Sequence, residues 1–128
     1  MEDLEGRNIL MVDDDTRNIF ALSSYLEYQG IRIRTAASGA EALKILDESR
    51  DIELVLMDVM MPEMDGFEAI RHIRNHPELH SLPVIAVTAS AMKGDREKCL
   101  EAGASEYVSK PVNLQELMDK MAELLADR

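Results

Sequence analysis

Five short segments of the chain have the pattern of β-strands. Residues 8–12, 54–57 and 84–87 are runs of almost only apolar side chains, as expected for strands that are buried on both faces of a sheet. Residues 31–36 alternate apolar with charged positions, and residues 106–109 are short and mixed. The last two patterns are typical of edge strands, which keep one side exposed to solvent.

Helical patterns occupy the intervals between these strands. Apolar residues recur three or four positions apart, and capping residues stand at several of the expected ends. The expected helices are 16–28, a second from Ser38 (a capping box with Glu41) to residue 48, a third that carries Phe67, Ile70 and Ile73 and ends before Pro77, a fourth from Ser90 to Ala102 with Gly103 as its C′ residue, and a fifth that opens at Asn113.

The strict alternation of strand and helix predicts an α/β fold with three layers. Short connections of this kind build a parallel sheet with right-handed crossovers and with helices on both faces. The two edge patterns belong to the second and fifth strands, so the buried strands are the first, third and fourth. This distribution favours a doubly wound (βα)5 sheet with the strand order 2-1-3-4-5, as in flavodoxin-like folds.

Polar side chains follow four of the predicted strands. Asp13 and Asp14 follow the first strand, Asp58 the third, Thr88 the fourth and Lys110 the fifth. The carboxyl ends of parallel strands meet at one edge of the sheet, and ligands bind there at the point where the strand order reverses. That point lies between the first and third strands, so the three aspartates are expected to converge in one crevice.

Such a group of carboxylates needs a counter-charge. The acids cannot all stay ionised unless a cation lies among them, and otherwise one of them is protonated. Oxygen ligands without neighbouring His or Cys suit a hard cation, and Mg²⁺ is the expected one because it needs only one or two carboxylates and water. With Thr88 and Lys110 beside it, the site has the parts to stabilise a phosphoryl group. Asp15, by contrast, has the position of a helix N-cap.

Composition narrows the classes of function. At 128 residues the chain is long enough for one domain with its own core. Its formal charge of −11 argues against nucleic-acid binding by this domain. No apolar run approaches the roughly 18 residues of a membrane span, and the acidic N-terminus is unlike a signal peptide, so a cytoplasmic protein is expected. The single cysteine, Cys99, is expected to be a packing residue.

The ordered set of motifs resembles the CheY-like receiver domain of two-component response regulators. The motifs are Asp13-Asp14 after the first strand, Asp58 followed by VMMPEMDG, Thr88-Ala89, Tyr107 and Lys110-Pro111. The resemblance covers residues 7–126 and leaves 1–6 as an N-terminal extension. The opening LEGRNILMVDDDTRN is most similar to the receivers of hybrid sensor histidine kinases.

The resemblance implies a phosphoacceptor switch and not an enzyme in the usual sense. Asp58 would accept a phosphoryl group from a phosphohistidine of a histidine kinase or a histidine phosphotransfer protein. Asp13, Asp14, Asp58 and the backbone carbonyl of Met60 would bind Mg²⁺, and Lys110 would contact the phosphoryl oxygens.

The resemblance also implies how the switch works. Thr88 would move toward the phosphoryl group and Tyr107 would swing inward behind it. These movements would change the surface of the fourth helix, fifth strand and fifth helix, which a downstream partner reads. A cis Lys110-Pro111 peptide and a weak or phosphorylation-dependent dimer are further expectations.

Other functions compete with this interpretation. A Mg²⁺-dependent phosphohydrolase of the haloacid-dehalogenase type also uses an aspartate nucleophile, but its D-x-D-x-T/V motif is broken where Arg17 follows Asp13 and Asp15. A flavodoxin would place FMN phosphate where this chain has three acids, and an EF-hand would need a D-x-D-x-D-G loop. A receiver that binds partners without phosphorylation is a further alternative.

The three histidines, His72, His76 and His80, fall four residues apart. Two histidines at this spacing on a helix can bind zinc. Pro77 interrupts the helix before the third histidine and no cysteine supports a site, so the pattern indicates a solvated face.

Overall fold

The computed structural model describes residues 4–60, 66–89 and 92–126, and its strands form one parallel sheet. The strand order is β2-β1-β3-β4-β5, which confirms the predicted doubly wound order. The strands are β1 (Asn8–Val12), β2 (Arg32–Ala36), β3 (Leu54–Asp58), β4 (Val84–Thr88) and β5 (Glu106–Ser109).

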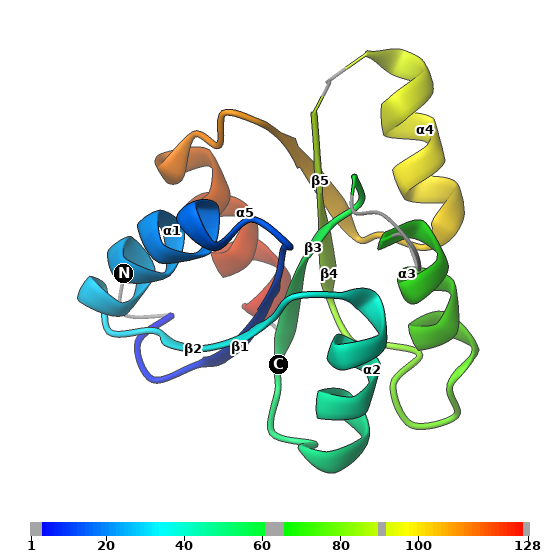
Figure 1. Ribbon diagram of the computed structural model, residues 1–128, viewed down its shortest axis with the longest axis horizontal. Helices are drawn as coiled ribbons and strands as arrows, with labels where there is room; N and C mark the ends of the chain where they lie inside the picture. Colours follow the sequence, from blue (N-terminus) through cyan, green and yellow to red (C-terminus); the bar gives the residue numbers. More distant parts are fainter. Residues whose placement is uncertain (1–3, 61–65, 90–91, 127–128) are drawn as a thin grey trace.

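The helices cover both faces of this sheet and make three layers (Figure 1). On one face lie α1 (Thr16–Tyr28) and α5 (Leu114–Leu125). On the other face lie α2 (Gly39–Glu48), α3 (Gly66–Asn75) and α4 (Lys93–Ala102). Within the described part of the chain, none of these helices has the length and apolar character that crossing a bilayer requires.

Two apolar cores lie on opposite faces of the central strands. In β1, Ile9 and Met11 belong to the core beneath α1 and α5, whereas Leu10 and Val12 belong to the core beneath α2, α3 and α4. Every residue of β3 and β4 is buried, so both faces of these strands need apolar side chains. Cys99 is also buried, as expected for a packing residue.

The helix ends follow the predicted capping residues. Ser38 Oγ accepts a hydrogen bond from the Glu41 N–H at 3.1 Å, and Asn113 Oδ1 accepts one from the Glu116 N–H at 2.9 Å. Gly103 ends α4 with a φ of 113°, a left-handed conformation that glycine adopts without steric cost. Ser90, the expected start of the fourth helix, lies outside the described residues, and α4 begins at Lys93.

The segment that precedes β1 contributes to the core. Leu4 is fully buried beneath α1 and α5, and the Gly6 N–H donates to the Gly30 carbonyl at 2.8 Å. The part of the expected N-terminal extension that the structure describes therefore packs against the domain.

Candidate functional site

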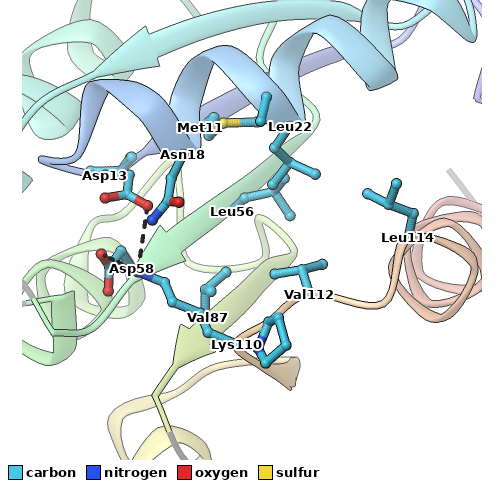
Figure 2. Close-up of a pocket in the computed structure, with 13 residues that line it drawn as sticks. Met11, Asp13, Asn18, Leu22, Leu56, Asp58, Val87, Lys110, Val112 and Leu114 are labelled. Atoms are coloured by element: carbon cyan, nitrogen blue, oxygen red, sulfur yellow. Dashed lines mark hydrogen bonds and ion pairs between the residues drawn. The ribbon is translucent and has the colours of Figure 1, made fainter.

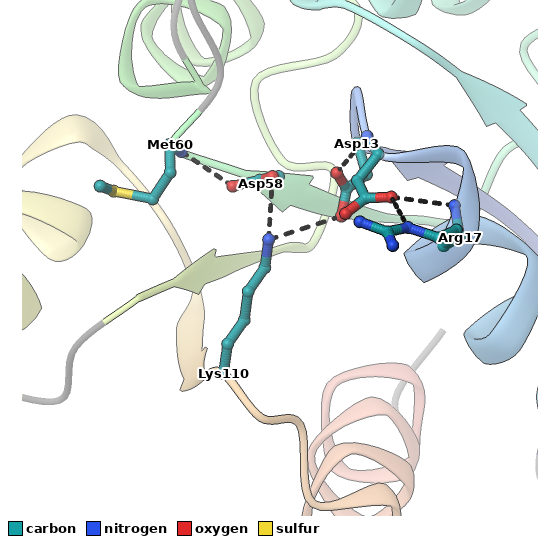
Figure 3. Close-up of polar contacts among 6 residues, drawn as sticks. Asp13, Arg17, Asp58, Met60 and Lys110 are labelled. Atoms are coloured by element: carbon teal, nitrogen blue, oxygen red, sulfur yellow. Dashed lines mark hydrogen bonds and ion pairs between the residues drawn. The ribbon is translucent and has the colours of Figure 1, made fainter.

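Asp58 stands at the carboxyl end of β3, where its side chain is only 3% exposed. Both carboxylate oxygens have partners (Figure 3). Oδ1 accepts a hydrogen bond from the Met60 backbone N–H at 2.8 Å, and Oδ2 lies 3.2 Å from Lys110 Nζ. These two contacts hold the carboxylate in one orientation.

Asp58 belongs to a cluster of three acids. Carboxylate oxygens of Asp13, Asp14 and Asp58 all lie within 4.8 Å of one another, as the sequence predicted. Asp13 is buried and its Oδ1 accepts the Asp15 N–H at 2.9 Å, whereas Asp14 is exposed. Burial and the charge of Asp58 raise the pKa of Asp13, although the hydrogen bond from Asp15 opposes the rise.

This donor set fits a hard divalent cation. Three carboxylates supply oxygen ligands at close range, which is the chemistry that Mg²⁺ prefers. Burial, together with the charge of Asp58, raises the pKa of Asp13, and a bound cation would favour the ionised form of this carboxylate.

Lys110 supplies a positive charge opposite the acids. Its Nζ lies 3.2 Å from Asp58 Oδ2 and 3.7 Å from Asp13 Oδ2 (Figure 3). Burial acts to lower the pKa of Lys110, but the charges of Asp58 and Asp13 outweigh it and the pKa is raised. The Lys110 N–H donates to the Thr88 carbonyl at 2.8 Å, and the Lys110-Pro111 peptide is cis, as predicted. The ammonium is therefore charged and held at the strand ends.

The structure confirms the predicted role of Asp15 but does not test the predicted role of Met60. Asp15 is the N-cap of α1: its Oδ1 accepts the Arg17 N–H at 2.9 Å, and this bond lowers the pKa of Asp15. The N-cap prediction is thus confirmed. Met60 contributes its backbone N–H to Asp58, while the role of its carbonyl as a metal ligand stays a prediction. Pro62, which follows in the sequence, lies outside the described residues.

The first residue of α3 lies close to the backbone at the end of β3. A Cβ added to Gly66, the first residue of α3, would lie 2.4 Å from the Asp58 carbonyl oxygen and 2.6 Å from the Val59 Cα. Side chains other than hydrogen are excluded at this distance, so glycine allows α3 to begin directly against the end of β3.

Thr88 and Tyr107 lie on the strands next to Asp58. Thr88 ends β4 and is 2% exposed. Tyr107 in β5 is half-buried, with Lys120 Nζ of α5 4.8 Å from its ring centroid and Arg96 Cζ of α4 6.0 Å from it. Lys120 Nζ also donates to the Tyr107 carbonyl at 2.6 Å, and Arg96 Nη1 lies 3.4 Å from the Tyr107 hydroxyl. The ring is therefore held by cations from two helices.

A groove of about 580 Å³ leads to the acidic cluster (Figure 2). Asp58 and Lys110 lie at one end of it, and Leu22 of α1 faces Val112 of the β5–α5 connection and Leu114 at the start of α5 along its length. The groove leaves Asp58 accessible from the side of α1 even though its side chain is almost wholly covered.

Arg74 is a residue whose role the sequence analysis missed. Its guanidinium donates to the Gly103 carbonyl at 2.7 Å and the Leu82 carbonyl at 2.7 Å, and also to the His80 carbonyl and Ser105 Oγ at 3.2 Å each. Burial lowers the pKa of Arg74. It joins α3, the α3–β4 loop and the end of α4, segments whose proximity the local sequence pattern does not indicate.

The histidines only partly form the predicted solvated face. His72 and His80 are exposed, as expected. The prediction is wrong for His76, whose side chain is 27% exposed and whose Nε2 lies 3.3 Å from Asp47 Oδ1 of α2. The reason is that α2 packs beside α3, which the spacing of the histidines could not reveal.

The chain is similar to known proteins over most of its length. The profile of the response regulator receiver domain matches residues 9–122. The transcriptional regulatory protein GltR of Pseudomonas aeruginosa is 40% identical over 120 residues, which are 94% of this chain and 49% of GltR, so the chain spans about half the length of that relative.

Two solved structures are similar over nearly their whole length. The receiver domain of sensor histidine kinase PA1611 from Pseudomonas aeruginosa PAO1, with a magnesium ion coordinated in its active-site cleft, is 35% identical at a TM-score of 0.87, with 94% of this chain and 98% of that chain covered. The receiver domain of Saccharomyces cerevisiae Ssk1, crystallised with the histidine phosphotransfer protein Ypd1, is 31% identical at a TM-score of 0.88, with 96% and 91% covered.

Proposed function

Because the chain belongs to the response regulator receiver domain family, whose members are phosphoacceptor signalling switches, we propose that Asp58 is the residue that becomes phosphorylated. The donor is a phosphohistidine on a histidine kinase or a histidine phosphotransfer protein. Membership of this family sets aside the phosphohydrolase and flavodoxin alternatives. A receiver is a signalling phosphoacceptor and not an enzyme in the usual sense.

The observation that carries this proposal is the fixed Asp58 carboxylate between Lys110 and the Met60 N–H. Asp13 is also buried and near Lys110. However, Lys110 Nζ lies 3.7 Å from Asp13 Oδ2 and only 3.2 Å from Asp58 Oδ2. Asp58 and Asp13 both line the groove, so a donor side chain can approach either of them there. The shorter distance to Lys110 favours Asp58 over Asp13.

The proposed transfer exchanges one phosphorus bond for another. An Asp58 oxygen attacks the phosphorus, and the P–N bond to the donor imidazole breaks as the new P–O bond forms. The imidazole nitrogen keeps the electron pair of the broken bond. Lys110 stabilises the charge on the phosphoryl oxygens during the transfer, and the Met60 N–H holds the carboxylate in position.

Mg²⁺ is the proposed cofactor of this site. Asp13, Asp14 and Asp58 would hold it, together with the carbonyl of Met60. When bound, Mg²⁺ supplies positive charge that neutralises the acids and the phosphoryl oxygens. The three close carboxylates and the raised pKa of Asp13 support this assignment.

The switch is proposed to follow from added charge. Phosphorylation places about two negative charges beside Lys110. Two unit charges 4 Å apart interact by about 4 kcal/mol at an effective dielectric constant of 20, which is enough to shift a two-state equilibrium. The Thr88 hydroxyl moves toward the new group, and Tyr107 leaves its place between Arg96 and Lys120 to turn inward. The surface of α4, β5 and α5 then changes, and a downstream partner binds one of its two forms.

The proposed class of phosphodonor for this chain is based on a partner of a similar protein. The Ssk1 receiver binds a histidine phosphotransfer protein in its co-crystal, and we propose a partner of that class or a kinase for this chain. A cytoplasmic location, a weak or phosphorylation-dependent dimer and an origin in a hybrid kinase stay predictions.

Phosphate incorporation from a radiolabelled phosphotransfer protein in the presence of Mg²⁺ tests the proposal. The parent protein should be labelled, and Asp58→Asn should not. Asp15→Asn is the matched control, because Asp15 is a nearby aspartate whose role is to cap α1, and it should be labelled like the parent. If Asp58→Asn is labelled as well as the parent, the assignment is wrong. If the parent is not labelled at all, the alternative of a phosphorylation-independent receiver gains support.

A further inference from the structure

A second group of metal-binding side chains lies between α2 and α3. His72 is in the last turns of α3, His76 follows the end of that helix, and Asp47 is in the last turn of α2. Together with Leu43 and Leu79 they line a hollow of about 130 Å³. As far as the chain is described, this hollow has no lining residue in common with the groove at Asp58.

We propose that His72, His76 and Asp47 bind one divalent cation of the imidazole-preferring class, of which Zn²⁺ is the representative. Two imidazoles and one carboxylate form a ligand set that Zn²⁺ uses in proteins, with water in the remaining position. Mg²⁺ is a hard cation that prefers oxygen ligands, so it should not compete at this position. The proposal is independent of the assignment of Asp58.

Two of the three ligands are already oriented toward each other. His76 Nε2 lies 3.3 Å from Asp47 Oδ1, and the His76 side chain is 27% exposed. The Glu78 N–H donates to His76 Nδ1 at 3.0 Å, so the ring is held from both sides. A cation at the junction of His76 and Asp47 would replace the contact between them and use the same two atoms.

The third ligand lines the same hollow as the other two. His72 lies in α3 and precedes His76 by four residues, and His76 follows directly after Asn75, the last residue of that helix. His72 is exposed, and its imidazole would have to turn toward Asp47 and His76 to complete the site, because these three side chains are not among the described groups whose ligand atoms already lie within 4.8 Å of one another. His80, one further step of four, lies beyond Pro77 and does not line the hollow.

Two features oppose binding and set its strength. Because His76 Nδ1 accepts the Glu78 N–H, the neutral ring carries its proton on Nε2. That proton moves to Nδ1 when the cation binds, and the hydrogen bond from Glu78 is lost. Arg50 also places a positive charge 3.7 Å from Asp47 Oδ1. We therefore expect a moderate affinity.

Calorimetric titration of the untagged protein with ZnCl₂ tests the site, with Mg²⁺ present in excess so that the acidic cluster is occupied. We expect one equivalent to bind, and His72→Gln and His76→Gln each to weaken binding by about tenfold or more. His80→Gln is the matched control and should bind like the parent. Arg50→Gln should bind more tightly, because it removes the competing charge at Asp47.

The circular dichroism spectra of the variants show whether each is folded. The proposal is overturned if the folded parent takes up no Zn²⁺, or if His72→Gln and His76→Gln bind as the parent does. It is also overturned if His80→Gln weakens binding as much as the other two, since the histidines would then act as a diffuse surface group.

Discussion

Gly66→Ala tests whether α3 is packed directly against the end of β3, which carries Asp58. The added Cβ would lie 2.4 Å from the Asp58 carbonyl oxygen, and ordinary contacts begin near 3.5 Å, so α3 or the strand end must shift by about 1 Å. The opposing atoms belong to the backbone and cannot turn away as a side chain can. Overpacking of this kind costs about 1–3 kcal/mol. We expect a cost near the upper limit, about 2–3 kcal/mol, and a fall in Tm of about 8–12 °C in calorimetry.

Gly94→Ala is the matched control for this prediction. Among the described residues, nothing lies within 4 Å of a Cβ added to Gly94 in the first turn of α4. Alanine favours a helix over glycine by about 0.5–1 kcal/mol, so this variant should be at least as stable as the parent. Gly66→Ala should also be labelled more slowly at Asp58, since the carbonyl that it displaces belongs to that residue. A Gly66→Ala protein with the Tm and labelling rate of the parent would refute the reasoning.

Three further predictions concern charge and hydrogen bonding. Because the folded-state pKa of Asp13 is raised, mainly by burial, the contribution of Asp13 to stability without Mg²⁺ is greatest below the ordinary value of 3.8 and is lost as the pH rises through the raised pKa. Urea titrations in EDTA should therefore show the free energy of unfolding of Asp13→Asn increasing relative to that of the parent over this rise, so that Asp13→Asn is the more stable protein at pH 7. Arg74→Lys keeps the positive charge but loses the planar guanidinium that donates hydrogen bonds to four acceptors. The free energy of unfolding should therefore fall by about 1–3 kcal/mol. A fall of less than about 0.5 kcal/mol would contradict a stabilising role for these hydrogen bonds. Tyr107→Phe loses only the 3.4 Å contact between its hydroxyl and Arg96 Nη1 at the surface. Its free energy of unfolding in the same urea titration should differ from that of the parent by less than about 0.5 kcal/mol.

The strand order of the sheet was predictable because the pattern of apolar and polar residues shows whether a strand is buried on both faces or lies at an edge. The apolar runs of β3 and β4 required cover on both faces, and the alternation in 31–36 required an edge. These constraints determined the strand order, and the order in turn brought Asp13, Asp14 and Asp58 to one crevice. The side chains that lie together at the ends of parallel strands can therefore be predicted from the sequence.

Contacts between helices were not predictable in the same way. His76 meets Asp47, and Arg74 meets Gly103, across helices that pack side by side. Their spacing in the sequence carries no sign of this, since it depends on how the helices are placed on the sheet. Leu4 was also missed, because a single apolar residue in an acidic segment has no periodicity to mark it as buried.

The central claim is tested most directly by locating the phosphoryl group. After reaction with a phosphohistidine donor and Mg²⁺, borohydride reduces an aspartyl phosphate to homoserine, and mass spectrometry of peptides then identifies its position. The account predicts homoserine at Asp58 and none at Asp13 or Asp14. Homoserine at either of these two residues, with Asp58 unchanged, would contradict it.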